Sequence, residues 1–374
     1  MKNFKAGTFI SQGSYKSFQP NFINKQLVLD NMEILTLLSE ADRHLGRLDM
    51  YSEYIPNINL FIRMHKIKEA TQSSKIEGTQ TNMEEAILNK ENVPLNKRDD
   101  WEEVQNYISA MNTAIDNLQK IPFSSRLIRE AHKVLMQGVR GEHKQPGEFR
   151  RSQNWIGGAT IKDAVFVPPV FESVQELMSD LEKFVHNEEI FIPELIKISL
   201  IHYQFETIHP FLDGNGRVGR LMITLYLVDK GILKKPILYL SDFLEKNKTT
   251  YIDNLTKVRE KNDLAQWMKF FLVGIIETAK NGIETFDGIL RLQKKVEAKI
   301  STLKSRAANA QQLINYLYQS PYIIPTAIPQ IVNISMASAY KLIGDLEELG
   351  IVKEVTGNQR DRYYLFNDYL KLFS

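Results

Sequence analysis

Residues 193–207 constrain the fold most, because apolar side chains cover nearly the whole circumference of the helix that they predict. The apolar residues are Leu195, Ile196, Ile198, Leu200, Ile201, Tyr203 and Phe205. A helix that is apolar all round is buried, so other elements have to surround it. A second helix is predicted at about 215–230, where apolar residues recur at helical spacing. The sequence therefore predicts a protein built around this helix pair.

The rest of the chain continues the helical pattern, with two exceptions. Further helices are predicted at about 29–50, 58–77, 99–119, 124–138, 172–186, 245–260 and 263–300. Residues 1–25 are polar and indicate an extended arm. Residues 153–167 hold two β-prone runs around a Gly-Gly pair and predict a small hairpin. The predicted fold class is all-α with a small β-hairpin.

Residues 301–374 are predicted to form a separate module. Three helical segments precede two β-prone runs that flank a turn at Gly357-Asn358. This order is that of a winged helix-turn-helix. The expected domains are an N-terminal helical region (1–98), a core (99–300) and the winged helix (301–374).

Composition excludes several kinds of chemistry and location. The 374 residues include no cysteine, which excludes disulfides, thiol catalysis and zinc–thiolate sites. The net charge of +2 is too small to imply a nucleic-acid or membrane partner. The first residues lack the apolar run of a secretory signal, and no apolar stretch approaches the roughly 20 residues of a membrane span. We expect a soluble cytoplasmic protein with no membrane partner.

Residues 209–220, with the sequence HPFLDGNGRVGR, carry most of the chemistry. Pro210 pushes His209 out of the α region, so the buried helix ends there and the imidazole stands in a loop. Gly214 and Gly216 allow main-chain N–H groups to approach a ligand closely. These glycines precede a helix N-terminus, which attracts anions. The loop therefore predicts an anion site beside an imidazole.

Charged side chains complete this predicted site. Arg217 and Arg220 are three residues apart, share a helix face and can grip phosphate oxygens. Asp213 is the only carboxylate of the loop and would hold Mg²⁺ beside phosphates. His209 has an ordinary pKa of about 6.5, so it can accept a proton from a hydroxyl at neutral pH. Each feature alone also fits a turn or a solvated helix face, and the phosphate site depends on their conjunction.

Residues 209–220 resemble, without departure, the signature His-Pro-Phe-x-(Asp/Glu)-Gly-Asn-Gly-Arg-x-x-Arg of the Fic (filamentation induced by cAMP) family of AMP transferases. The resemblance implies transfer of AMP from ATP to a Ser, Thr or Tyr hydroxyl of a target protein or of the chain itself. It implies that His209 deprotonates the hydroxyl, that Asp213 holds Mg²⁺ and that Phe211 anchors the loop. The residues implied to bind phosphate are Gly214, Asn215, Gly216, Arg217 and Arg220.

A second segment, from Ser73 to Gly78, is similar to the family's inhibitory pattern (Ser/Thr)-x-x-x-Glu-(Gly/Asn). The resemblance implies the subgroup whose N-terminal region, here 1–98, carries an inhibitory helix and whose C-terminus is a winged helix. Glu77 would pair with Arg220 and block the γ-phosphate of ATP. Glu77 also stands in the last turn of a predicted helix, where a carboxylate costs roughly 0.3–1 kcal/mol. A cationic partner would relieve that cost.

The resemblance also suggests where the target protein and the adenine base of the nucleotide would bind. Residues 153–167 match the family's flap, which registers the target segment by strand addition; a purely structural hairpin is the alternative. Tyr239, Tyr251 and Trp267 either border the nucleotide base or belong to the core. Relatives in the family often self-associate, so the resemblance also suggests a homodimer.

Three other functions stay open. The predicted winged helix would fit a DNA-binding regulator, with Arg360 and Arg362 in the wing. However, residues 301–374 hold seven Lys and Arg against six Asp and Glu, and DNA binding depends on neutralising phosphates. A Fic relative could instead use another nucleotide or remove AMP. A metallohydrolase built on His202 and His209 is least favoured, because no zinc-ligand spacing accompanies them.

Overall fold

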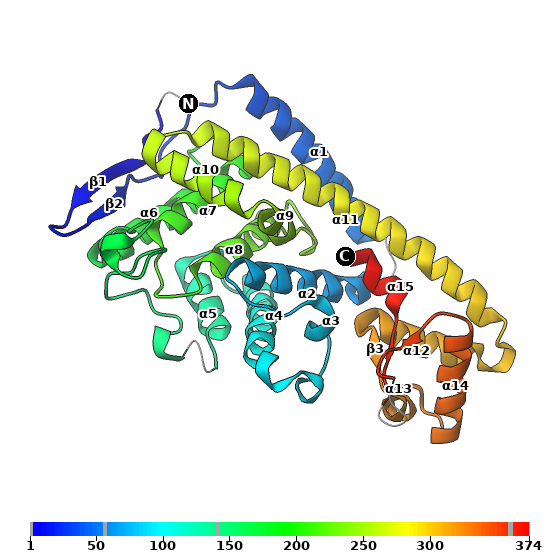
Figure 1. Cartoon of the computed structure of the whole chain (residues 1–374). Helices are drawn as coiled ribbons and strands as arrows, with labels where there is room; N and C mark the ends of the chain where they lie inside the picture. The colour runs from blue at the N-terminus through cyan, green and yellow to red at the C-terminus, as the bar shows by residue number, and fades with distance from the viewer. Residues whose placement is uncertain (1–2, 55–57, 139–141, 358–361, 374) are drawn as a thin grey trace.

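The computed structural model describes residues 3–54, 58–138, 142–357 and 362–373. The helix predicted at 193–207 is α7 (Glu194–Ile208), and all its residues from Leu195 to Ile208 are buried. α8 (Asn215–Asp229) follows it and packs against it in the middle of the molecule (Figure 1). The predicted all-helical core is therefore confirmed.

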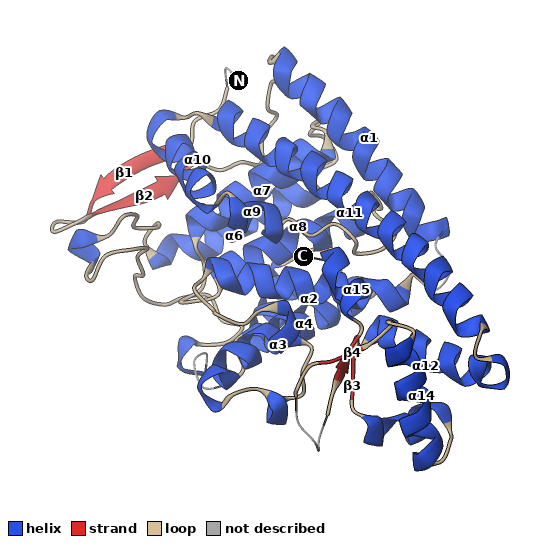
Figure 2. Ribbon diagram, turned by 45° about the vertical axis from the view of Figure 1, so that its right-hand side comes forward, coloured by secondary structure: helices blue, strands red, loops and turns tan. Residues whose placement is uncertain are grey.

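Helices from both halves of the chain surround the α7–α8 pair (Figure 2). They are α1 (Met32–Tyr54), α2 (Asn59–Ile76), α3 (Met83–Ala86), α4 (Arg98–Leu118), α5 (Ser125–Leu135), α6 (Val174–His186), α9 (Ser241–Lys246), α10 (Lys248–Lys261) and α11 (Leu264–Ser301). Side-chain caps fix some of their starts: Ser124 accepts a hydrogen bond from the Leu127 amide before α5. The long helices α1 and α11 lie side by side (Figure 1).

α2 is held between the core and the C-terminal end of the chain. It contacts α4, α8 and α9 from the core. The Phe61 ring centroid lies 6.4 Å from that of Tyr369, and the His65 ring lies 5.0 Å from Phe373. The end of α2 at Ile76 is therefore positioned relative to α8.

The C-terminal module, residues 301–374, forms the three predicted helices and the two predicted β-prone runs, together with one strand and a final short helix that were not predicted. Its helices are α12 (Ala307–Gln319), α13 (Ile328–Val332), α14 (Met336–Glu348) and α15 (Asn367–Leu370). Its antiparallel sheet has the order β3-β5-β4, formed by β3 (Tyr322–Ile323), β4 (Lys353–Glu354) and β5 (Tyr364–Leu365). Residues 358–361, which include Arg360 and Asn358 of the predicted turn, lie outside the described residues. The winged-helix assignment stays a prediction.

The first 25 residues contain a hairpin, where the sequence predicts only an extended arm. β1 (Gly7–Ser11) pairs antiparallel with β2 (Lys16–Pro20), and Figure 1 shows this ribbon projecting from the helical body. Its residues are largely polar and show no alternation of buried and exposed side chains, although Phe18 lies in the core. The Phe18 amide donates to the Val167 carbonyl oxygen at 2.9 Å, so β2 lies against the predicted flap.

The hairpin predicted at 153–167 is present in reduced form. Its two arms meet at one β-bridge between Ile156 and Phe166. Gly157 and Gly158 both have positive φ, at 69° and 75°, and turn the chain away from a regular ladder. The segment is therefore a loop closed by one bridge pair.

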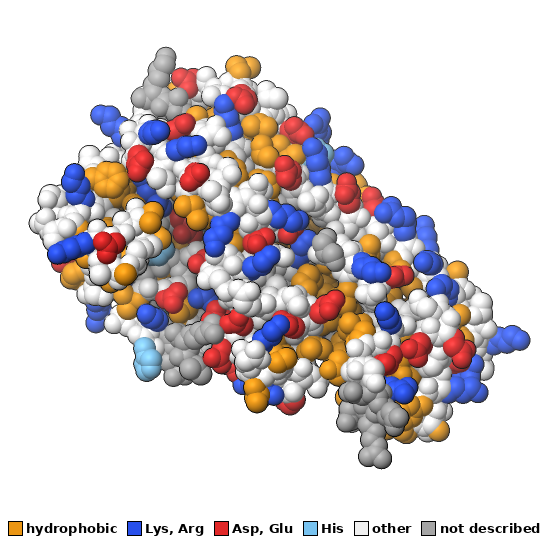
Figure 3. Space-filling model, in the orientation of Figure 1, with side chains coloured by type: hydrophobic (Ala, Val, Ile, Leu, Met, Phe, Trp, Pro, Cys, Tyr) orange, Lys and Arg blue, Asp and Glu red, His pale blue; other side chains and the backbone are white. Residues whose placement is uncertain are grey.

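The face of the molecule shown in Figure 3 carries side chains of both charges, with no large patch of one sign. Lys and Arg side chains are interspersed with Asp and Glu, also over the C-terminal module at the lower right. A nucleic-acid-binding face gathers cations, so this face does not favour the DNA-binding alternative. Among the described residues, no helix combines the length and apolar character needed to cross a membrane.

Candidate active site

His209 directly follows α7 and adopts the left-handed conformation, with φ 51° and ψ 60°. Its amide still donates to the Phe205 carbonyl at 2.9 Å. A non-glycine residue in this region costs about 1–3 kcal/mol and persists only where its surroundings impose it. The chain therefore turns sharply at His209, between the end of α7 and the loop that leads to α8.

The loop between α7 and α8 is closed by its own side chains. Asn215 accepts a hydrogen bond from the Phe211 amide at 2.8 Å and donates to the Phe211 carbonyl at 2.9 Å. Phe211 is fully buried and stacks on the His132 ring, with centroids 3.8 Å apart and planes 9° apart. The Asn215 side chain is thus used inside the loop, and the main-chain N–H of Asn215 is left for a phosphate.

Glycines at the start of α8 allow neighbouring side chains to approach the main chain more closely than any other residue would permit. Gly214 has a φ of 74°, and a Cβ there would lie 2.8 Å from the Met136 sulfur. A Cβ on Gly216 would lie 2.3 Å from Oε1 of Glu77. The Glu77 carboxylate therefore occupies the space above the first turn of α8, where an anion would meet unpaired amides and the positive end of the helix dipole.

Arg220 holds that carboxylate from inside the protein. Its Nη2 lies 2.7 Å from Glu77 Oε1 and 2.8 Å from the Ser73 carbonyl oxygen, and its Nε donates to Ser73 Oγ at 2.8 Å. The Arg220 side chain is 1% exposed and that of Glu77 is 40% exposed. Burial acts to raise the pKa of Glu77, but Arg220 and Arg217 outweigh it and lower this pKa. Glu77 is therefore ionised at neutral pH.

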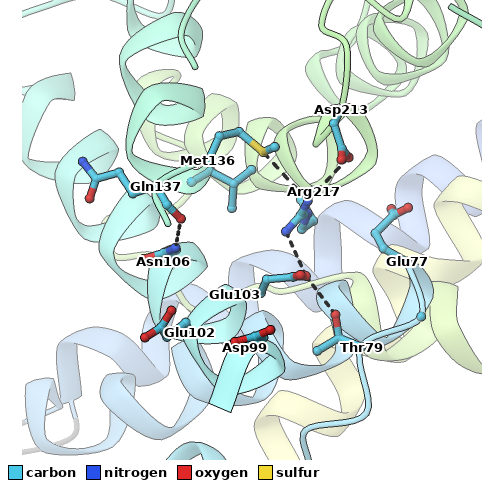
Figure 4. Close-up of a pocket in the computed structure, with 12 residues that line it drawn as sticks. Glu77, Thr79, Asp99, Glu102, Glu103, Asn106, Met136, Gln137, Asp213 and Arg217 are labelled. Atoms are coloured by element: carbon cyan, nitrogen blue, oxygen red, sulfur yellow. Dashed lines mark hydrogen bonds and ion pairs between the residues drawn. The ribbon is translucent and has the colours of Figure 1, made fainter. Parts of the chain in front are cut away.

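Arg217 is also paired with a carboxylate. Its Nη1 lies 3.4 Å from Glu103 of α4, which in turn accepts a hydrogen bond from Thr79 at 3.1 Å. Figure 4 shows Glu103 between Thr79 and Arg217. The Nε atom of Arg217 is buried and has no hydrogen-bond partner among the described residues. Arg217 thus keeps donor capacity for a further anion.

Asp213 lies on the rim of the same pocket. Its side chain is 47% exposed, and Oδ1 lies 3.7 Å from Arg217 Nη2. The pocket in Figure 4 is lined by the carboxylates of Glu77, Asp99, Glu102, Glu103 and Asp213. A half-exposed carboxylate beside a phosphate-sized space fits Mg²⁺, which takes few protein ligands together with phosphate oxygens and waters.

The His209 imidazole is neutral at physiological pH. Burial and the guanidinium of Arg259 lower its pKa to about 4. The Nδ1 atom is buried, with no hydrogen-bond partner among the described residues. A neutral imidazole at this position can accept a proton.

Several contacts in this site were not anticipated from the sequence. Gly147 donates its N–H to Nδ1 of His132 at 2.9 Å, so Nε2 of that ring carries a proton for the Asp213 carbonyl at 3.0 Å. Arg150 donates to the His209 carbonyl, and Asn154 donates to the Phe211 carbonyl. All three side chains bind main-chain atoms of the loop, and no residue pattern in the sequence reports such contacts.

The aromatic residues considered for the nucleotide base lie in the core: Tyr239, Tyr251 and Trp267 are 7%, 4% and 0% exposed. His202, named in the metallohydrolase alternative, uses both ring nitrogens: one contacts the Gly219 carbonyl and the other the Tyr251 hydroxyl, each at 2.9 Å. No cluster suited to hold a metal by three or more His, Asp or Glu side chains occurs in the described parts of the chain. The histidine-based metal site therefore gains no support.

Comparison with known proteins identifies one family. Residues 35–116 match the family described as Fic/DOC family N-terminal, and residues 122–227 match the Fic/DOC family. A protein adenylyltransferase Fic from Drosophila erecta is 29% identical over 154 residues, which cover 41% of this chain and 28% of that protein. A probable protein adenylyltransferase from Aquifex aeolicus is 30% identical over 163 residues, covering 41% of this chain and 46% of that protein. The matched part spans less than half of each relative.

Solved structures extend the likeness of the fold beyond the matched sequence. A Fic family protein from Desulfovibrio desulfuricans superposes with a TM-score of 0.59 at 20% identity, covering 91% of this chain and 98% of that one. Fic-1 from C. elegans superposes with a TM-score of 0.51 at 18% identity, covering 70% and 74% of the two chains.

Proposed function

Because the chain belongs to the Fic/DOC family, we propose that it is a protein adenylyltransferase that moves AMP from ATP to a Ser, Thr or Tyr hydroxyl of a target protein or of itself. The observation that carries the proposal is the start of α8, where the carboxylate of Glu77 lies against Gly216 and Arg220, and the neighbouring Arg217 pairs with a second carboxylate, Glu103. The names of the matched relatives support the same activity.

The proposed reaction gives each group of the site one role. The target hydroxyl attacks the α-phosphorus of ATP and gives its proton to the neutral imidazole of His209. The bond from the α-phosphorus to the bridging oxygen breaks, and pyrophosphate leaves. The amides of Gly214, Asn215 and Gly216 and the guanidiniums of Arg217 and Arg220 would bind the phosphates and stabilise the charge that develops on them. Mg²⁺ held by Asp213 would neutralise part of that charge.

We also infer that Glu77 inhibits the enzyme. Its carboxylate lies 2.7 Å from Arg220 and in the space above Gly216, where a γ-phosphate would otherwise be bound. Two anions cannot share Arg220 at this distance without strong repulsion. ATP would then bind poorly or in an unproductive pose until the segment from Ser73 to Gly78 moves.

The test uses ATP labelled on either the α- or the γ-phosphate. Glu77→Gly should label itself or added protein from the α-labelled nucleotide only, and faster than the unmodified chain. Adding His209→Ala to Glu77→Gly should reduce labelling by about 10²–10⁴-fold. Transfer of the γ-label would identify a kinase and contradict the proposal.

Other outcomes of the same assay separate the alternatives. Labelling from a different nucleoside triphosphate, but not from ATP, would favour another nucleotide. Loss of AMP from a previously labelled protein on incubation with the chain would favour AMP removal. Dependence on Mg²⁺, a cytoplasmic location and a homodimer remain predictions.

A further inference from the structure

Arg150 is a buried side chain that the proposed reaction does not use. It is 2% exposed. Its Nε donates to the His209 carbonyl at 3.0 Å, and Nη2 donates to the carbonyls of Ile208 at 3.4 Å and Pro169 at 2.6 Å. Its Nη1 donates to the Ser152 carbonyl at 3.3 Å. These hydrogen bonds all end on main-chain oxygens.

The carbonyls bound by Arg150 belong to two different segments. Ile208 and His209 form the turn between α7 and the catalytic loop. Ser152 directly precedes the flap segment 153–167, and Pro169 follows it. The Arg150 amide also donates to the Pro210 carbonyl at 2.8 Å. One residue therefore joins both ends of the flap to the turn that carries the imidazole.

The flap makes a second link to the same loop. The Nδ2 atom of Asn154 lies 2.9 Å from the Phe211 carbonyl and 3.4 Å from the His209 carbonyl. The His209 carbonyl oxygen thus accepts hydrogen bonds from both Arg150 and Asn154. His209 is in the left-handed conformation, which a non-glycine residue keeps only when its surroundings fix it. These donors supply such a constraint.

A lysine could not replace this guanidinium. Arginine presents five donors in a rigid planar fork, whereas lysine presents three from a single nitrogen. Burial lowers the pKa of Arg150 to about 10, so the side chain stays charged at neutral pH. The planar fork fits this role because its three nitrogens donate to four carbonyls at once.

We propose that Arg150 is a positioning residue that registers the flap against His209, so that a hydroxyl presented by the flap meets the imidazole. The inference rests on the proposed adenylyltransferase function. It predicts that loss of Arg150 slows AMP transfer while the phosphate-binding start of α8 still binds nucleotide.

The experiment compares Arg150→Lys with Arg151→Lys, both in the Glu77→Gly protein. Arg151 is the neighbouring residue and is exposed, so the same substitution there is a matched control. The dissociation constant of MgATP, the rate of AMP transfer at saturating ATP and the melting temperature are measured for each. Arg150→Lys should lose about 10–100-fold in transfer rate, because a small misplacement of reacting groups has an effect of this size. Its MgATP affinity should stay within about threefold of the parent.

Two further variants keep the test decisive if Arg150→Lys folds poorly. Asn154→Ala removes the second link between the flap and the catalytic loop. This variant should also transfer AMP more slowly while its affinity for MgATP stays close to that of the parent. Arg150→Ala leaves a space shaped for a guanidinium, and added guanidinium ion at millimolar concentration should restore part of its transfer rate. Rescue of this kind is not expected from a residue that only stabilises the fold.

The outcomes distinguish this inference from the function on which it rests. If Glu77→Gly transfers no AMP, the proposed function fails and the role of Arg150 fails with it. If Glu77→Gly is active and Arg150→Lys and Asn154→Ala transfer at the parent rate, only the positioning role is overturned. A parallel loss of MgATP affinity and rate in these variants would also overturn it, because it would indicate a collapsed site.

Discussion

A methyl group on Gly216 provides a sharp test of where Glu77 lies. An ideal Cβ at this position would be 2.3 Å from Glu77 Oε1 and 2.9 Å from Nη1 of Arg220. Ordinary contact begins at about 3.4 Å, so Gly216→Ala should push the carboxylate away by about 1 Å or more. The hydrogen bond of 2.7 Å between Glu77 and Arg220 would then be lost.

The size of the effect follows from two opposing terms. A hydrogen bond to a charged group contributes about 1.5–3 kcal/mol, and we take the lower end because the Glu77 side chain is 40% exposed. Alanine in place of glycine in a helix adds about 0.5–1 kcal/mol of stability. Gly216→Ala should therefore destabilise the unmodified chain by roughly 0.5–1 kcal/mol. The new methyl group also displaces the end of the Arg220 side chain, with or without Glu77. The free-energy cost of that displacement therefore cancels when the two backgrounds are compared.

The assay is a double-mutant cycle of Gly216→Ala and Glu77→Gly, followed by chemical denaturation. In the Glu77→Gly protein the methyl group meets no carboxylate, so its cost should disappear or reverse in sign. The coupling between the two positions should be about 1.5 kcal/mol. Equal effects of Gly216→Ala in both backgrounds would refute the inference that Glu77 fills the space above α8.

Two further predictions concern the charges of the pocket. Since the folded pKa of His209 is about 4, below its ordinary value, the folded state gains no proton there as pH falls through about 6. The neutral imidazole contributes its full stability to the folded state above about pH 6.5, and this contribution declines as the pH falls toward 4. Titration of the ring nitrogens followed by NMR should give a midpoint near pH 4. A midpoint near pH 6.5 would contradict the burial of the imidazole. In the Glu77→Gly protein, Glu103→Gln should strengthen MgATP binding up to about fivefold, since roughly 1 kcal/mol of pairing with Arg217 is released. Glu102→Gln, also on the pocket wall, is the matched control, and equal effects of both changes would show that only net charge matters.

The helices and the loop 209–220 could be predicted because the residues that define each of them are close together in the sequence. Apolar residues recur at helical spacing in α7 and α8, and the residues of 209–220 are contiguous in the chain. The pairing of Glu77 with Arg220 joins residues 143 positions apart. Only the resemblance to the family suggested that pair, because spacing along the chain says nothing about such a contact.

What could not be predicted depends on contacts with the main chain. Arg150 and His132 bind carbonyl and amide groups, and almost any sequence offers such groups. The β1–β2 ribbon was missed since its strands are short and largely polar, and Phe18 gains its partners only in the folded protein. The reduced flap follows from two glycines with positive φ, where the sequence suggested regular strands.

A crystal structure of Glu77→Gly with MgATP would show directly whether the start of α8 binds a triphosphate. The γ-phosphate should lie beside Arg220, where the carboxylate of Glu77 lies in the unmodified chain, and the α-phosphate should lie over the start of α8 within reach of His209. A nucleotide bound elsewhere, or an empty α8 terminus at saturating MgATP, would contradict the claim that this helix start is a triphosphate site.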